Sequence, residues 1–219
     1  MLSRRALIAA SVAATALIGS LAIVIMLRTA PSQAQDSEGG DISVADLATS
    51  GSSLPEKTMG QSTAPVTVIE YASMTCPHCA RFNAEVFPKF KAKYIDSGHV
   101  YYILREFPLD PRATGGFMLA RCASDDKYFA MVDVLFEQQK NWAFVEAKDV
   151  VPGLLQIAKQ AGITQERFDA CLKDKNIEAG IDAVQNRAKT VFKVSGTPTF
   201  FVNGKRADGE LSIEELDAL

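Results

Sequence analysis

The chain has 219 residues, of which 47% are hydrophobic and 22% charged, a composition typical of a globular protein and unlike a fibrous or disordered one. The formal net charge is −3, although the first 35 residues carry three arginines and no acid, so the rest of the chain is distinctly acidic. An acidic surface argues against nucleic-acid binding, because contacts with phosphate need a basic patch.

The first 28 residues are predicted to be a signal peptide or a signal-anchor transmembrane helix. Arg4 and Arg5 precede an uncharged stretch, residues 6–27, which is about as long as the roughly 20 residues that cross a bilayer as a helix. This length favours an anchor with the two arginines on the cytoplasmic side. The alternative is a soluble protein released by cleavage near Ala34, where the flanking residues resemble a signal-peptidase site.

Residues 29–57 are rich in Ser, Gly, Ala and acidic residues. Such a segment buries too little apolar surface to offset its ordering entropy, so we interpret it as a flexible linker. A short helix around residues 42–47 is the one element expected there. The folded domain is expected to cover residues 58–219, which is enough for a single domain with a sizeable core.

The folded part is predicted to contain strands near both ends and helices between them. In chain order, the pattern predicts a strand over 66–71, a helix through 82–94 with a kink at Pro88, a strand over 100–104, a helical block at about 112–192, a strand over 196–202, a hairpin turn at 203–204 and a helix from Ser212. This order indicates an α/β sheet interrupted by a helical insertion.

The motif Cys76-Pro77-His78-Cys79 lies between the first strand and the first helix. A cysteine at a helix N-terminus is favoured as a thiolate, and Pro77 suits the first helical turn. His78 would stabilise the Cys76 thiolate further if it is charged or donates a hydrogen bond. Cys79 lies one turn on, close enough to form a disulfide with Cys76. A stabilised thiolate favours the reduced form and makes the disulfide a stronger oxidant.

Two other interpretations of this motif are open. Half of a zinc site is one, but the only other histidine is His99, and Cys122 and Cys171 are distant in the sequence. The other is a purely structural disulfide between Cys76 and Cys79, which would constrain the unfolded chain little because its loop is so short. A redox-active dithiol is favoured over both.

Residues 68–79 (VIEYASMTCPHC) and 196–204 (GTPTFFVNG) together resemble the DsbA family of thioredoxin-fold thiol oxidoreductases. The resemblance covers about residues 58–219, and the CPHC motif is that of the oxidising members. It implies a thioredoxin-like fold with a helical insertion domain. It also implies that Cys76 is the exposed nucleophile and that Cys79 is the resolving thiol.

The resemblance further implies roles for residues outside the motif. The Thr197–Pro198 peptide bond is expected to be cis and to lie against Cys76, with the Thr197 backbone available to a substrate strand; a trans proline at a strand start is the alternative. Glu70 matches the family's buried acid, and burial would raise its pKa so that it could relay the Cys79 proton. The alternative for Glu70 is a solvated charge at the sheet margin.

Cys122 and Cys171 both fall within the predicted insertion. In an oxidising compartment two surplus cysteines are expected to pair, so we predict a structural disulfide between them. The alternative is a pair of buried, reduced thiols that act as small hydrophobic residues.

These observations predict a periplasmic thiol–disulfide oxidoreductase, anchored in the inner membrane by residues 6–27 or released near Ala34, that introduces disulfides into exported proteins through Cys76 and Cys79. It would need no bound cofactor or metal, because the cysteine pair carries the electrons. Its expected partners are reduced or misoxidised exported polypeptides and, by resemblance, a quinone-linked membrane oxidase; a monomer is expected. The alternatives are a reductase or isomerase of the same fold, and a tethered binding or chaperone module with a structural disulfide.

Overall fold

The computed structural model describes residues 42–219. The signal or anchor segment predicted at 1–28 and the linker residues 29–41 lie outside the described residues. Between residues 42 and 219, no helix combines the length and the apolar character needed to cross a bilayer.

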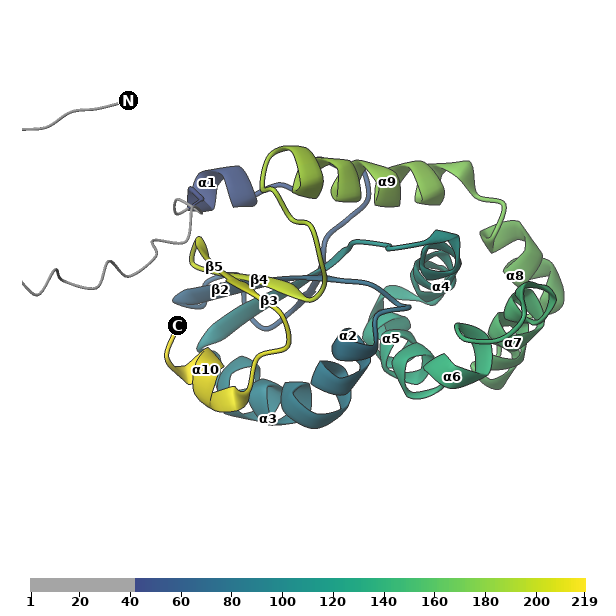
Figure 1. The fold of residues 1–219 in the computed structure, drawn as a ribbon, viewed down its shortest axis with the longest axis horizontal. Helices are drawn as coiled ribbons and strands as arrows, with labels where there is room; N and C mark the ends of the chain where they lie inside the picture. The colour runs from purple at the N-terminus through teal and green to yellow at the C-terminus, as the bar shows by residue number, and fades with distance from the viewer. Residues whose placement is uncertain (1–41) are drawn as a thin grey trace, which may run out of the picture. The chain divides into compact units, whose positions relative to one another are not determined.

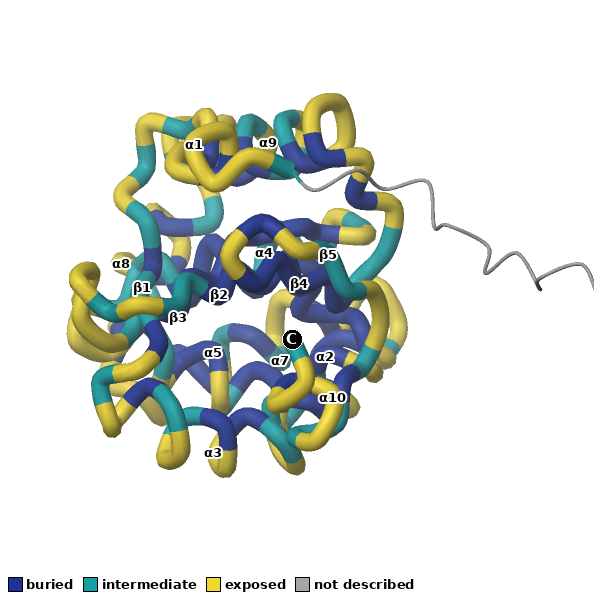
Figure 2. Tube along the Cα trace, turned by 90° about the vertical axis from the view of Figure 1, so that its left-hand side faces the viewer, coloured by how far each residue is buried: buried dark blue, intermediate teal, exposed yellow. Residues whose placement is uncertain are grey.

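A five-stranded mixed sheet forms the centre of the described part, and its central strands are buried (Figure 2). The strand order is β1-β3-β2-β4-β5; β2 and β3 run parallel, and every other neighbouring pair is antiparallel. The strands are β1 (Lys57–Met59), β2 (Val66–Ala72), β3 (Val100–Glu106), β4 (Thr199–Val202) and β5 (Lys205–Asp208). The strands and the hairpin turn at residues 203–204 confirm the sequence pattern, except that the strand predicted over 196–202 begins only at Thr199. Strand β1, only three residues long, was missed.

Helices cover both faces of the sheet, and a helical cluster lies at one end of it (Figure 1). They are α1 (Val44–Leu47), α2 (Pro77–Arg81), α3 (Phe87–Phe90), α4 (Pro111–Cys122), α5 (Tyr128–Glu137), α6 (Gln139–Trp142), α7 (Ala147–Gln160), α8 (Gln165–Cys171), α9 (Lys175–Thr190) and α10 (Ile213–Asp217). Helices α4 to α9 occupy the region of the predicted insertion.

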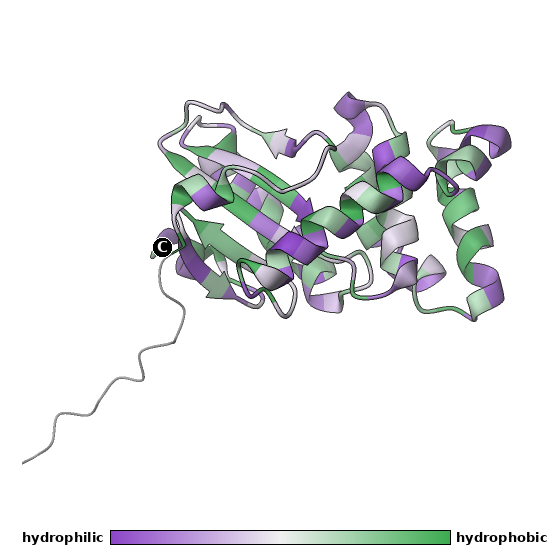
Figure 3. Cartoon of the chain, turned by 90° about the horizontal axis from the view of Figure 1, so that it is seen from above, coloured by the Kyte–Doolittle hydropathy of each residue, from purple (hydrophilic) through white to green (hydrophobic). Residues whose placement is uncertain are grey.

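Helix α9 closes the insertion and returns to the sheet. Its residues Val184 and Ala188 are buried in one cluster with Ile69 of β2 and Ile103 of β3, so α9 covers a face of the sheet together with α1. Hydrophilic and hydrophobic residues alternate along α9, as expected for a helix with one buried side (Figure 3).

The helix that follows the CPHC motif is irregular on both sides of Pro88. Residues Phe82–Val86 and Lys91–Ile95 form π-helical segments that flank α3, and the Phe87 N–H donates to the Phe82 carbonyl, five residues back. Proline has no N–H to donate to the carbonyl four residues back, so the regular hydrogen bonds of an α-helix are interrupted at Pro88. The irregularity expected at Pro88 is therefore present, as π-helical turns.

The prediction of a flexible linker is wrong for residues 42–57. Leu47 in α1 is buried in the core. The guanidinium of Arg105, itself only 1% exposed, donates to the Leu47 carbonyl over 2.7 Å and pairs with Glu56 over 2.7 Å. A buried arginine must have its donors satisfied, and this segment supplies the acceptors. The short helix expected around 42–47 is confirmed as α1.

Candidate active site

Cys76 occupies the N-cap position of α2, where the end of β2 passes into the helix. Its Sγ accepts a hydrogen bond from the Cys79 N–H over 3.4 Å, and Pro77 stands in the first helical turn. Both cysteines are free thiols in this structure. The local sequence therefore produces the predicted arrangement, with a sulfur facing the free N–H groups of a helix.

The segment before β4 lies against this sulfur. The Thr197–Pro198 peptide bond is cis, as the resemblance implied. In its thiol form, Cys76 donates a hydrogen bond to the Thr197 carbonyl oxygen, with 3.2 Å between sulfur and oxygen. The trans alternative is wrong, and the predicted contact between this segment and Cys76 is confirmed.

The expectation that Cys76 is exposed needs correction. The residue is only 4% exposed, because the helix N-terminus and the cis-proline segment enclose it, and Cys79 is fully buried. Cys76 is still the more accessible of the two sulfur-bearing residues. An incoming thiol would therefore meet Cys76 first.

The two cysteines have opposite acidities. The pKa of Cys76 is lowered to about 5, chiefly by the hydrogen bond from the Cys79 thiol. Thr197 and the N–H groups of Cys79 and His78 lower it further, whereas burial opposes the shift. Burial, above all, raises the pKa of Cys79 well above its usual value, and the charges of Glu70 and Cys76 raise it further. At neutral pH, Cys76 is a thiolate and Cys79 a thiol.

Glu70 lies on β2 beneath the cysteines. Residues alternate between the two faces of a strand, so Glu70 shares its face with Val68 and Ala72, whose side chains belong to the same core cluster as Cys79. Glu70 is only 3% exposed and accepts a hydrogen bond from the Tyr102 hydroxyl over 2.6 Å. Burial raises the pKa of Glu70 to about 7. The prediction of a buried acid is confirmed, and the solvated alternative is wrong.

The structure corrects the expectation for His78. Its side chain is 59% exposed, and its Nδ1 lies 3.1 Å from Glu210 and 2.8 Å from the Arg81 guanidinium. No hydrogen bond from the ring to Cys76 is recorded among the described residues. The backbone N–H of His78 contributes to the low pKa of Cys76.

Sequence reasoning missed a buried glutamine from the insertion. The side-chain amide of Gln139, in α6, donates to the carbonyl oxygens of Met74 (2.9 Å) and Cys76 (3.1 Å). It thus fixes the loop that carries Cys76. No local pattern signals this role, because Gln139 is 63 residues away from Cys76 in the sequence. It also follows Gln138, and nothing in the sequence distinguishes the two glutamines.

An open groove of about 1,030 Å³ borders the active-site helix. Pro77 and Ala80 line it on the helix side, and Gln139 and Phe144 line it on the insertion side. Phe144 is 54% exposed. This groove offers an apolar surface directly beside the motif.

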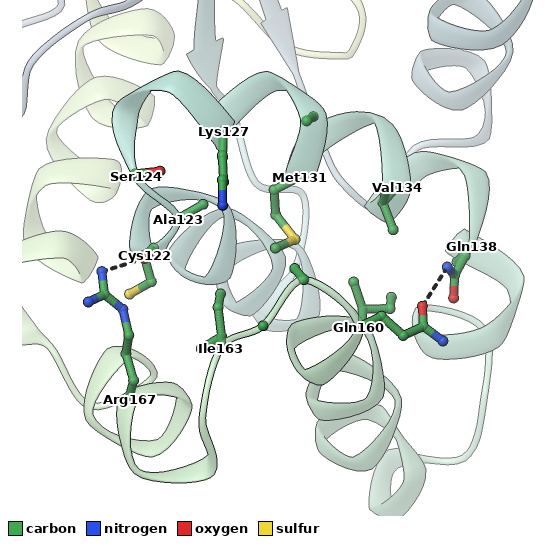
Figure 4. A pocket seen from close by; sticks show the side chains of 14 residues that line it. Cys122, Ala123, Ser124, Lys127, Met131, Val134, Gln138, Gln160, Ile163 and Arg167 are labelled. Carbon is green, nitrogen blue, oxygen red and sulfur yellow. Dashed lines mark hydrogen bonds between the residues drawn. The ribbon is translucent and has the colours of Figure 1, made fainter.

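Cys122 and Cys171 form a disulfide that joins the end of α4 to the end of α8, with 6.1 Å between their Cα atoms. The prediction that they pair is confirmed. Cys122 also lines a separate cavity of about 590 Å³ between α5, α7 and α8, where Lys127 and Arg167 are the charged lining residues (Figure 4). None of the CPHC residues lines this cavity.

The comparison with known proteins agrees with this geometry. Residues 52–219 match the thioredoxin family model. The crystal structure of alpha-DsbA1 from Wolbachia pipientis superposes with a TM-score of 0.70 at 33% identity, over 75% of this chain and 89% of that one. The chain belongs to the DsbA family. The expected thioredoxin-like fold with a helical insertion is confirmed.

Two further relatives add to this assignment. A Rickettsia bellii protein named as a protein-disulfide oxidoreductase is 34% identical over 161 residues, which are 73% of this chain and 61% of that protein. A Bacillus anthracis protein named as disulfide bond formation protein D is 29% identical over 164 residues, or 70% of this chain and 72% of that protein. This DsbA-family chain spans 55% to 61% of the length of the Rickettsia relatives.

Proposed function

We propose that this DsbA-family protein is a thiol–disulfide oxidoreductase that introduces disulfide bonds into exported polypeptides. The observation that carries the proposal is the contrast between the two cysteines: the pKa of Cys76 is lowered to about 5, whereas the pKa of Cys79 is raised. A thiolate that is stabilised in the reduced protein favours reduction of the enzyme, and therefore oxidation of the substrate.

The reaction starts from a disulfide between Cys76 and Cys79. A substrate thiolate attacks Cys76 Sγ, a mixed disulfide forms, and the bond to Cys79 breaks with the electron pair left on Cys79. The Cys79 thiolate then takes up a proton, which the buried carboxyl of Glu70 can relay because its pKa lies near 7. A second substrate thiolate attacks the substrate sulfur of the mixed disulfide and releases Cys76 as a thiolate. The substrate gains a disulfide, and the enzyme ends as the dithiol present in this structure.

The surroundings of the motif support a class of substrate, whereas the proposed partners rest on the sequence and on the family resemblance. The groove that runs from Pro77 to Phe144 can receive an unfolded segment with apolar side chains, so reduced or misoxidised exported polypeptides are the proposed substrates. The proposed site of action is the periplasm, with the chain either anchored by residues 6–27 or released near Ala34. A quinone-linked membrane oxidase is the proposed acceptor of the two electrons.

Paired cysteine variants test the proposal. Both variants are first treated with oxidised glutathione, and the excess is removed, so that Cys76 of Cys79→Ser carries glutathione in a mixed disulfide. A reduced, unfolded polypeptide should then displace the glutathione thiolate and accumulate as a mixed disulfide with Cys76 of Cys79→Ser, because the resolving thiol is missing. Cys76→Ser should form no mixed disulfide and should not oxidise the polypeptide. Oxidation by Cys76→Ser at the wild-type rate would contradict the proposal and favour a binding module with a structural disulfide.

A further inference from the structure

Three charged or ionisable side chains form a cluster at the edge of the CPHC motif. Arg81 donates from Nε to both carboxylate oxygens of Glu210, over 3.2 and 3.0 Å, and from Nη2 to Oε2 over 2.7 Å. The same Nη2 lies 2.8 Å from His78 Nδ1, which is also 3.1 Å from Glu210 Oε2. Glu210 is the least exposed of the three, at 24% of its side chain against 51% for Arg81 and 59% for His78.

The cluster joins two parts of the fold. His78 and Arg81 are three residues apart on α2, so they lie on the same side of the helix. Glu210 belongs to the loop between β5 and α10, far from α2 in the sequence. A single ring nitrogen cannot accept from Arg81 and donate to Glu210 at the same time, so His78 has two alternative partners. Glu210 contacts both Arg81 and His78 and holds them together.

The charge of this cluster acts on the nucleophile. The pKa of Glu210 is lowered, chiefly by the hydrogen bonds from Arg81, so its carboxylate remains ionised at neutral pH. The pKa of Arg81 is raised, chiefly by its hydrogen bonds to Glu210, and the Cys76 thiolate contributes to this shift. Cys76 is the N-cap of the short helix α2 that carries His78 and Arg81, so the Arg81 charge lies within about two helical turns of the Cys76 sulfur. The Glu210 carboxylate, paired with Arg81 over 2.7 Å, offsets that charge.

We propose that Glu210 is a positioning residue of this active site, which holds Arg81 and His78 against the loop before α10 and cancels one positive charge beside Cys76. Glu210 thereby limits how strongly the site favours the thiolate, and so sets how oxidising the Cys76–Cys79 pair is. This inference rests on the proposed redox function of that pair, but not on the direction in which electrons flow.

Glu210→Gln tests the proposal with little change of shape, because the amide oxygen can still accept from Arg81. Removal of the negative charge should lower the pKa of Cys76, measured from the thiolate absorbance or from the pH dependence of its alkylation. It should also shift the equilibrium with glutathione about 3- to 10-fold toward the reduced protein, as expected for a shift of about half to one pKa unit. Glu210→Asp keeps the charge and should restore values close to the wild type.

Glu214→Gln is the matched control, since it removes the same charge from an exposed acid in α10 that makes no side-chain hydrogen bond within residues 42–219. An unchanged Cys76 pKa in Glu210→Gln, or an equal shift in Glu214→Gln, would overturn the proposal. Failure of the proposed function gives a different result. If Cys76 and Cys79 of the wild-type protein do not exchange with glutathione, the redox function is contradicted. The pH dependence of Cys76 alkylation still decides the role of Glu210 in that case.

Discussion

Cys76 and Cys79 are three residues apart, yet their surroundings shift their pKa values in opposite directions. Cys76 receives hydrogen bonds from the helix N-terminus and from Cys79, whereas Cys79 is buried above a carboxyl group. Hydrogen bonds to the charged form lower a pKa, and burial without a partner raises it. Because of this asymmetry, Cys76 can leave a disulfide as a stable thiolate, whereas Cys79 needs a group nearby that donates or accepts its proton.

The role of Glu70 leads to a prediction about pH. Tyr102→Phe removes the hydrogen bond that lowers the pKa of Glu70, so this pKa should rise above about 7, observable by NMR of labelled carboxyl groups. The pH dependence of the step in which a substrate thiolate attacks Cys76 and releases Cys79 from the Cys76–Cys79 disulfide should then shift upward. Glu70→Gln should slow this release about 100-fold, a typical effect of losing a general acid or base.

Tyr94→Phe is a suitable control for that experiment, because the Tyr94 hydroxyl bonds to the exposed Asp217 and not to Glu70. It should leave both the pKa of Glu70 and the release rate unchanged. A Glu70→Gln protein that releases Cys79 at the wild-type rate would show that water alone carries the proton.

The elements around the motif are held by contacts from the insertion. Gln139 reaches from α6 to two carbonyl groups of the active-site loop, and Thr75 in the same loop donates to Asp110, the N-cap of α4, over 2.6 Å. The insertion is therefore a structural support of the loop that carries Cys76 as well as one wall of the neighbouring groove.

We predict that Gln139→Leu destabilises the protein by about 1 to 3 kcal/mol, because it leaves the carbonyl groups of Met74 and Cys76 buried without their donor. Gln138→Leu is the matched control, since the Gln138 side chain bonds only to exposed Gln160 over 3.3 Å, and it should cost far less. Chemical denaturation of both variants measures the difference. Equal stabilities would contradict the support role of Gln139.

The Cys122–Cys171 disulfide links two helices of the insertion and closes a separation of 49 residues. Replacing both cysteines by alanine should lower the free energy of unfolding by up to about 4 kcal/mol under the chain-entropy estimate. The glutathione equilibrium of the Cys76–Cys79 pair should not change, because this disulfide joins the ends of α4 and α8, and not α6, whose Gln139 holds the active-site loop. A large shift of that equilibrium would show that the two cysteine pairs are coupled.

Sequence patterns predicted the elements with strong local signals: the β-branched strand β2, the CPHC motif at a helix start and the Asn203-Gly204 turn, where both residues have positive φ values. They missed β1, which is too short for a periodic pattern. They also missed Gln139 and Glu210, because each reaches the site across more than 60 residues of sequence. Such contacts exist only once the chain is folded.

At the scale of the whole molecule, the acidity of Cys76 links redox state to stability. The folded, reduced protein has a Cys76 pKa near 5, below the ordinary value of 9.0, so it binds fewer protons than the unfolded chain between these pH values. Its stability should therefore rise with pH in this range. The raised pKa of buried Glu70 has the opposite effect, because it makes the free energy of unfolding fall as pH rises toward 7. Glu70 is buried in both redox states, so its effect largely cancels when the stabilities of the reduced and oxidised proteins are compared.

We predict that the stability of the reduced protein relative to the oxidised protein rises by about 2 kcal/mol between pH 5 and pH 7. The physical reason is that only the reduced protein contains the stabilised thiolate. Thermal or chemical unfolding of both forms across this range measures the difference. A difference that does not vary with pH would contradict the low pKa of Cys76.

The reduction potential of the full chain in a series of glutathione buffers tests most directly whether the Cys76–Cys79 pair is an oxidant. The structure predicts a value at or above about −180 mV, in the range of oxidising thiol–disulfide proteins. A value close to about −270 mV would place the protein among reductants and contradict the proposed oxidase function.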